Sequence, residues 1–425
     1  MNRFQQRRTI SWVRVLVVAG TLIFSEFQTV LASDHLDTPT VIADPAADIR
    51  DIFAWTSSDG KRLNLVMDIV AHQFSDRLQY VFHVDSGERF GKTTATTLIV
   101  CRFDAANTVE CWVGNADYVH GDASNTVGIE GKNRRFRVFA GLRDDPFFNN
   151  VKGTRAAYNV AGAALQHGTT TDAAGCPQFD EATSRSILDT WRHTDGGLAT
   201  NLLAGWKSSA LVLSIDLDVV NSGGKLLAVW GAVHKLPRVK AWPKEGTKGR
   251  IPAIPRLGEP IERTARPLIK NGLVGGPLAP DAISNQRKES YNRVGRTGWA
   301  QFSTYIEQTL GLYDGFDGKC GNQWLSDPNA KGPVRYQTLA KILADDRLWV
   351  NSKSSVCTQF LAVEFTEFKT PGALSGDCGG RTPNYPAPNI FRSLLTNGTT
   401  TGVDDGLRGD DKVHSTTDFP FLAAP

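Results

Sequence analysis

Seven short segments in the first half of this 425-residue chain alternate apolar and polar residues, with turn residues between them. This spacing, with Val, Ile, Leu, Phe and Trp prominent, predicts antiparallel strands that form a sandwich or a related β architecture. The predicted strands are 63–70, 79–85, 97–103, 108–114, 135–141, 210–220 and 225–235. The sequence Asn-Ser-Gly-Gly at 221–224 predicts a hairpin between the last two strands.

The second half of the chain has a different pattern. Residues 236–280 contain eight of the 20 prolines and little periodicity, which is typical of an extended connector on the surface. Beyond it, apolar residues three and four apart predict helices at 302–312, 334–348 and 390–395. We therefore expect a mainly β fold of antiparallel, sandwich-like sheets with a mixed helical and irregular C-terminal part. The expected divisions are a signal peptide at 1–32, a β-rich domain at 33–235, a basic Pro-rich connector at 236–300, and a C-terminal region at 301–425 packed on the β domain.

The first 32 residues have the features of a cleaved export signal. Four arginines precede the apolar residues 15–24, and Val30 and Ala32 supply the small residues that a signal peptidase needs. The apolar run is too short to cross a bilayer, which requires about 20 residues. We expect cleavage after Ala32, a periplasmic or extracellular protein, and no stable membrane span. The pair Arg7-Arg8 leaves a twin-arginine route open beside the general secretory route.

Six cysteines follow the signal, and an even number in an exported chain favours disulfides. A hairpin centred near residue 106 would place Cys101 opposite Cys111, close enough for a bond. Cys357 with Cys378 is a second candidate pair. No CxxC spacing indicates a metal role for the cysteines.

Charge excludes one class of partner and suggests another. Without residues 1–32 the chain has 43 basic and 43 acidic residues, so no global excess favours nucleic acid. Residues 235–296 nevertheless contain 14 basic and 5 acidic residues. This block is the candidate surface for an acidic partner.

The start of the predicted mature chain offers metal ligands. Cleavage after Ala32 would make His35 the third residue, and a free amine, two amides and an imidazole can wrap Cu²⁺ or Ni²⁺. Asp37, Asp48 and Asp51 follow closely, and carboxylates near turns suit Ca²⁺. The alternative is that these aspartates cap turns and that His35 and Asp37 tie the first strand to the sheet.

A second candidate group lies at the end of a predicted strand. Alternation places His83 and Asp85 on the same face, so that the carboxylate could orient the imidazole in a metal or acid–base site. A structural histidine held by a hydrogen bond explains the same pattern.

A third group is the loop that contains Arg143, Asp144 and Asp145, which two phenylalanines follow. The loop could bind a cation or another ligand. The alternative is an arginine–carboxylate lock that pins the loop while the two rings enter the core. The acidic glycine-containing loops near 314–318 and 404–411 are expected to be solvated turns.

Several blocks of this sequence resemble bacterial exported proteins catalogued as domain of unknown function 4331. The matching blocks are SDHLDTP at 33–39, DPAADIRDIFAW at 44–55, VFAG at 138–141, RDDPFF at 143–148, AVW at 228–230 and DFPFLA at 418–423. The resemblance implies an exported protein and carries no catalytic residue over to this chain.

Three functions fit these patterns. The preferred function is an exported β-rich binding or scaffold protein with Ca²⁺ in Asp-lined loops. The second is a metal-dependent extracytoplasmic enzyme in which His35, His83 and nearby aspartates converge. The third is capture of Cu²⁺ or Ni²⁺ at the mature N-terminus. No Walker loop, GxGxxG, HExxH or GxSxG motif is present, which disfavours the enzyme classes that a single short motif reveals.

Overall fold

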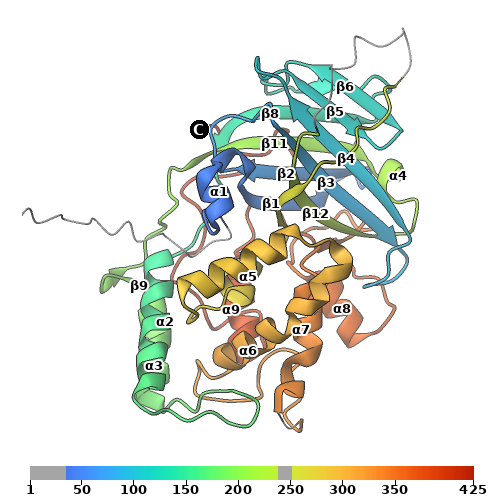
Figure 1. The fold of residues 1–425 in the computed structure, drawn as a ribbon. Helices are drawn as coiled ribbons and strands as arrows, with labels where there is room; N and C mark the ends of the chain where they lie inside the picture. The colour runs from blue at the N-terminus through green and yellow to red at the C-terminus, as the bar shows by residue number, and fades with distance from the viewer. Residues whose placement is uncertain (1–34, 238–250, 331) are drawn as a thin grey trace, which may run out of the picture.

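The computed structural model describes residues 35–237, 251–330 and 332–425, and these form two large antiparallel sheets with helices gathered at one end (Figure 1). The predicted export junction after Ala32 lies outside the described residues. None of the helices within the described ranges has both the length and the apolar character needed to cross a membrane.

The first sheet has five strands in the order β1-β2-β11-β8-β7. Its strands are β1 (Ile49–Thr56), β2 (Arg62–Ile69), β11 (Lys207–Asp216), β8 (Phe136–Asp144) and β7 (Ile129–Glu130). All eight residues of β1 and seven of the eight in β2 are buried, so both faces of this sheet edge are covered. A strand that is covered on both faces needs long apolar runs, and polar residues within it must find internal partners.

The second sheet has seven strands, with β14 paired to β12 beside the order β13-β12-β3-β4-β5-β6. Its strands are β3 (Leu78–Gly87), β4 (Ala95–Phe103), β5 (Val109–Val113), β6 (Asp117–Gly121), β12 (Leu226–Lys235), β13 (Pro260–Thr264) and β14 (Leu348–Asn351). Cys101 and Cys111 are register partners of β4 and β5 and form a disulfide. The structure therefore confirms the predicted cross-strand pair.

The two sheets pack face to face around one core. Gly231 of β12 lies at a close approach of the two sheets, because a Cβ at this position would stand 2.4 Å from Ile52 Cδ1 and 2.8 Å from Met67 Cε. Both of those side chains come from the five-stranded sheet. Only glycine allows this spacing without moving a neighbouring chain.

All seven predicted strands are present, and the antiparallel β-rich fold class is confirmed. The predicted hairpin at 221–224 is wrong. A turn does form, with Gly224 N donating to Asn221 O, but β11 and β12 belong to different sheets. The short helix α4 (Leu217–Val220) carries the chain from one sheet to the other. Alternation shows that a segment is a strand but not which neighbour it pairs with.

Most of the helices gather below the sandwich in Figure 1, whereas α1 (Pro39–Ala43) lies beside the sheets. The others are α2 (Val151–Gln166), α3 (Glu181–Trp191), α5 (Asp281–Arg293), α6 (Ser303–Asp314), α7 (Gln337–Ala344), α8 (Ala362–Lys369) and α9 (Ala387–Asn397). Shorter elements are the helical turns η1 (Pro45–Ala47), η2 (Ile269–Val274), η3 (Arg296–Phe302) and η4 (Gly332–Tyr336), and a small two-stranded sheet of β9 (His193–Thr194) and β10 (Gly197–Leu198). The helix predicted over 334–348 is shorter, because its last residue begins β14. The helices α2 and α3 lie within the segment that was expected to be a β-rich domain and were not predicted.

Two further disulfides brace the helical part. Cys176, before α3, bonds to Cys320, after α6. Cys357 bonds to Cys378, as predicted from the sequence. Free cysteines are not found among the described residues.

The expected surface connector at 236–300 differs from the structure in its second half. Residues 238–250 lie outside the described residues, but β13, η2 and α5 follow within 260–293. Glu262, Arg263 and Lys270 are at most 1% exposed. The segment is part of the core because its charged side chains find partners inside the protein.

Parts of the C-terminal segment, residues 376–425, return to the edge and the outer face of β1. Arg381 forms a backbone bridge with Ala54 of β1. Trp55 packs edge-on against Phe421, with ring centroids 4.9 Å apart, and its indole N–H donates to Thr416 O at 3.0 Å. The end of the chain therefore closes over its first strand.

Candidate functional site

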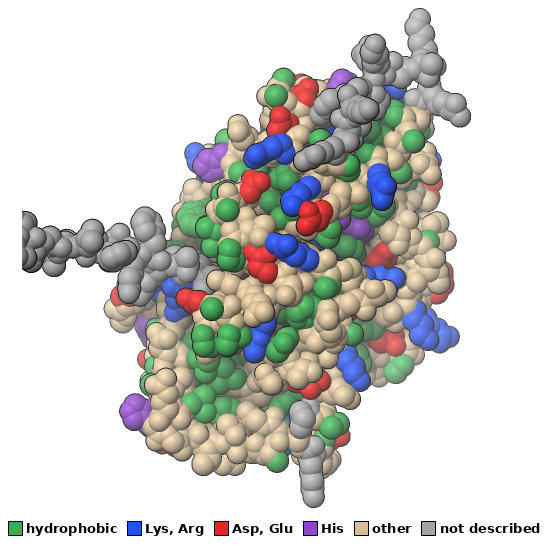
Figure 2. Space-filling view, in the orientation of Figure 1, with side chains coloured by type: hydrophobic (Ala, Val, Ile, Leu, Met, Phe, Trp, Pro, Cys, Tyr) green, Lys and Arg blue, Asp and Glu red, His purple; other side chains and the backbone are tan. Residues whose placement is uncertain are grey.

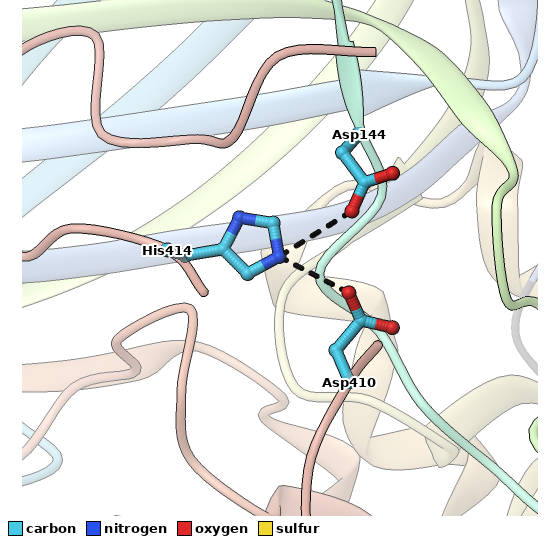
Figure 3. Close-up of side chains that lie close together, drawn as sticks. All are labelled: Asp144, Asp410 and His414. Carbon is cyan, nitrogen blue, oxygen red and sulfur yellow. Dashed lines mark hydrogen bonds and ion pairs between the residues drawn. The ribbon is translucent and has the colours of Figure 1, made fainter. Parts of the chain in front are cut away.

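Three polar side chains converge where β8 meets the C-terminal segment (Figure 3). Nε2 of His414 lies 3.2 Å from Asp410 Oδ2 and 3.6 Å from Asp144 Oδ2. Within the described ranges, no other group of three His, Cys, Asp or Glu residues brings its ligand atoms within 4.8 Å of one another. Distance alone therefore qualifies this triad as a candidate metal centre.

Local hydrogen bonds hold each member of the triad in place. Asp144 ends β8, and its N–H donates to Ala423 O at 3.1 Å. Asp410 accepts a hydrogen bond from Asn201 Nδ2 at 3.1 Å. The triad thus joins the sheet, a loop and the C-terminal segment.

The backbone fixes the protonation of His414. The N–H of Ala423 donates to Nδ1 at 3.1 Å, so Nδ1 has no proton of its own. Neutral His414 then carries its proton on Nε2, which faces both carboxylates. A histidine that binds a metal normally donates its other ring N–H, and here that nitrogen accepts instead. His414 therefore fits the role of a hydrogen-bond donor to Asp410 and does not fit the role of a metal ligand.

A lysine supplies the positive charge beside the triad. Lys412 Nζ lies 3.1 Å from Asp144 Oδ1. Burial nevertheless raises the pKa of Asp144 to about 6. Burial acts in the same direction on Asp410, but the hydrogen bonds from His414 and from the backbone of Asp411 and Lys412 together outweigh it and lower the pKa of that carboxyl. The two carboxylates therefore differ in basicity, and Lys412 pairs with Asp144.

The predicted N-terminal group is buried and has no member in the triad. His35 is 3% exposed, and its ring lies 5.9 Å from Trp206. Burial, followed by the charges of Arg50 and Lys270, lowers the pKa of His35 well below its usual value. Capture of Cu²⁺ at the mature N-terminus stays a prediction, and it would require His35 to leave this packed position.

Asp37 and Asp48 lie near a buried lysine. Lys270 Nζ of η2 stands 3.6 Å from Asp37 Oδ2 and forms a short ion pair with Glu262. Asp48 Oδ2 accepts the Leu36 N–H at 2.6 Å. Burial and the neighbouring Asp37 raise the pKa of Asp48 to about 8. This arrangement resembles the structural alternative, in which these aspartates bond nearby backbone amides, as Asp48 does with the Leu36 N–H.

Asp51 lies on the outer face of the five-stranded sheet beside a carboxylate that the sequence analysis missed. Asp68 of β2 is the register partner of Asp51 and is fully buried. Arg381 pairs with Asp51, and Arg50 Nη1 pairs with Asp145 Oδ2 at 2.6 Å. Burial, then Asp145 and Asp51, raise the pKa of Asp68 well above its usual value. Asp68 sits within an apolar strand, so only its occurrence in that strand could have drawn attention to it.

Ion pairs hold the loop after β8, but Arg50 and Lys412 supply the positive charges in place of the expected Arg143. The guanidinium of Arg143 lies over the Phe139 ring at 4.4 Å and donates to Leu142 O. Arg50 pairs with Asp145, and Lys412 pairs with Asp144. The two phenylalanines at 147–148 are buried, as the lock hypothesis expects.

His83 and Asp85 share a face of β3 but have different partners. Asp85 accepts hydrogen bonds from Thr96 Oγ1 at 2.5 Å and from Arg347 Nη1 at 2.9 Å. The His83 ring stacks on Trp230, with centroids 3.6 Å apart. The expected orientation of His83 by Asp85 is therefore replaced by aromatic stacking.

Much of the basic block at 235–296 is neutralised internally. Arg263 pairs with Asp346, and Arg266 pairs with Glu364, all at most 1% exposed. On the face drawn in Figure 2, basic and acidic side chains are interspersed. The charge excess predicted an acidic partner, but Arg263 and Arg266 pair with carboxylates of this chain.

Comparison with protein-family models, curated proteins and solved structures gave no match. The resemblance to domain of unknown function 4331 stays a prediction. Only the geometry of the described residues indicates a function.

Proposed function

We propose that this chain is an exported binding protein that holds a hard divalent cation, Ca²⁺, between Asp144 and Asp410. The observation that carries the proposal is the convergence of these two carboxylates on one point, from segments far apart in the sequence. Three disulfides support export, because such bonds persist in oxidising compartments.

The protonation of His414 decides the class of ion. Nε2 holds a proton, so the atoms offered to an ion are carboxylate oxygens. Oxygen ligands suit Ca²⁺, whereas Zn²⁺ and Cu²⁺ favour imidazole nitrogen. His414 donates a hydrogen bond to Asp410 and keeps that carboxylate oriented.

Lys412 competes with the ion for the same charge. Its ammonium lies 3.1 Å from Asp144 Oδ1, where a cation would also be attracted. The Lys412 side chain is 34% exposed, so it can swing into solvent when an ion binds. Ca²⁺ would then replace the Lys412 ammonium beside Asp144 and link the C-terminal segment to β8.

The test is calorimetric titration of the full chain with Ca²⁺. We expect one ion per chain, and Asp144→Asn should abolish binding because it removes a charged ligand. Lys412→Met should strengthen binding, since it removes the competitor without touching a ligand. Asp418→Asn, an exposed aspartate in the same segment, is the matched control and should bind as the parent does. Binding that survives Asp144→Asn, or no binding by the parent chain, would refute the proposal.

A further inference from the structure

Three buried nitrogens lie together on the outer face of the seven-stranded sheet. They are Nε2 of His83, Nε1 of Trp230 and Nε2 of His234, and none has a hydrogen-bond partner among the described residues. His83 belongs to β3 and the other two to β12, which are neighbouring strands (Figure 1). Buried polar atoms are normally satisfied, so this group indicates a missing partner.

The hydrogen bonding of His234 leaves a lone pair available. Nδ1 of His234 lies 3.0 Å from Gly258 O, and a carbonyl oxygen can only accept, so Nδ1 carries the proton. Nε2 is then unprotonated in the neutral ring. A backbone carbonyl that holds Nδ1–H is the arrangement found in metal-binding histidines. His234 is 8% exposed, which shields Nε2 from bulk water.

The two imidazoles lean toward each other. His83 is the register partner of Trp230, and His234 lies four residues further along β12, about 13 Å at the usual rise per residue. The ring centroids are nevertheless only 6.5 Å apart. Ala232 lies between Trp230 and His234 on this face and presents only a methyl group. Two imidazoles that share one ion place their centroids about 5 to 6.5 Å apart, given metal–nitrogen bonds of about 2.0–2.1 Å.

We propose that His83 and His234 form a binding site for a late first-row transition-metal ion of the Zn²⁺ class. Imidazole nitrogen suits such ions, whereas Ca²⁺ prefers oxygen. Two protein ligands leave further positions for water or a bound molecule. Trp230 stacks on His83 at 3.6 Å and is in turn covered edge-on by Trp299 at 5.2 Å, so the His83 ring is held in place.

The environment keeps both rings in the form that binds a metal. Burial lowers the pKa of His83 to about 3, with the neighbouring His234 acting in the same direction. Burial also lowers the pKa of His234. Both imidazoles are therefore neutral at ordinary pH, so an ion need not displace a proton from a charged ring.

The test is titration of the full chain with Zn²⁺, followed by calorimetry. We expect one high-affinity ion per chain. His83→Ala and His234→Ala should each weaken binding by roughly tenfold or more, since even partners outside the ligand set contribute that much. His120→Ala, an exposed histidine on β6, is the matched control and should bind Zn²⁺ as the parent does.

Two further measurements keep the outcome decisive. His35→Ala and Asp144→Asn should leave Zn²⁺ binding unchanged, which separates this site from the N-terminus and from the proposed Ca²⁺ site. In the parent chain, Zn²⁺ should shift the imidazole C–H resonances of His83 and His234, a readout that does not depend on whether a variant folds. The proposal would be overturned by unshifted resonances, or by alanine variants that both bind Zn²⁺ as tightly as the parent chain does.

Discussion

The two outer faces of the sandwich solve the burial of polar groups in opposite ways. The five-stranded face carries carboxylates, Asp51 and Asp68, and the C-terminal segment brings Arg381 to pair with Asp51. The seven-stranded face carries neutral rings, His83 and His234, whose Nε2 atoms have no described partner. On the first face the protein itself supplies the counter-ion of Asp51, and on the second face the two nitrogens are completed only by something added. A charge that is buried must be paired within the fold, whereas a neutral nitrogen costs less and can wait for a ligand.

The largest expected effect is on the charged face. Arg381→Met should lower the free energy of unfolding by about 3–5 kcal/mol, because it leaves a buried carboxylate without its cation. Urea denaturation measures this loss. Arg381→Met combined with Asp51→Asn should recover part of it, and Arg77→Met at an exposed pair should change little. A loss below about 1 kcal/mol would mean that the two faces do not differ in this respect.

The disulfide that braces the cover of the charged face should have the next effect. Replacing Cys357 and Cys378 with serine should cost about 3 kcal/mol, since the bond closes a loop of 21 residues. Hydrogen exchange should rise at the Ala54 N–H, which donates to Arg381 O. Replacing Cys101 and Cys111 is the control on the other sheet and should leave the exchange of Ala54 unchanged. Equal exchange in both variants would show that Cys357–Cys378 does not hold the cover.

The pH dependence of Asp68 sharpens the comparison further. Its pKa is raised in the folded state, so the folded chain keeps a proton that the unfolded chain releases above about pH 4. Folding stability from this group is therefore present below that pH and declines as pH rises, by at most about 1.4 kcal/mol per unit. The Asp68→Asn variant has no titratable proton at this position. Its free energy of unfolding, relative to that of the parent, should therefore rise from pH 4 to pH 7. Denaturation midpoints at several pH values measure it, with the exposed Asp76→Asn as control; a constant difference would show that Asp68 is ionised in the fold.

The smallest effect is expected on the neutral face. Trp230→Phe removes an indole N–H that has no described partner, whereas Trp299→Phe removes one that donates to Val294 O at 3.1 Å. Trp299→Phe should therefore be more destabilising, by about 1 kcal/mol. The two rings are in contact and lose the same atoms, which makes them a matched pair. A larger loss at Trp230 would show that its N–H already has a partner.

The sequence predicted the strands well because their alternation is a local property. The segments of β2, β3, β4, β5, β8, β11 and β12 were all identified, and so were two disulfides. The hairpin at 221–224 failed because two successive strands can enter different sheets, and no local pattern records that choice. The helices α2 and α3 were missed for a related reason: the apolar positions of α2 are mostly alanine, and α3 has few apolar residues, so both give a weak periodic signal.

The candidate sites were predicted only in part. Asp144 was identified, but Asp410 was assigned to a solvated turn, and His414 was not singled out. Its position four residues after Asp410 was the available signal. His83 was identified, but together with Asp85, which lies two residues away in sequence. His234, which approaches it in space, lies on the neighbouring strand β12. Partners that come from distant segments depend on sheet order, which the sequence pattern leaves open.

The return of the C-terminal segment over β1 sets an order in time. A ribosome delivers β1 long before Arg381, so Asp51 must stay hydrated until almost the whole chain has been synthesised. Early burial of that face would trap the Asp51 carboxylate without its counter-ion. The five-stranded sheet should therefore be the last part of this molecule to become dry, although its strands are among the first to be made.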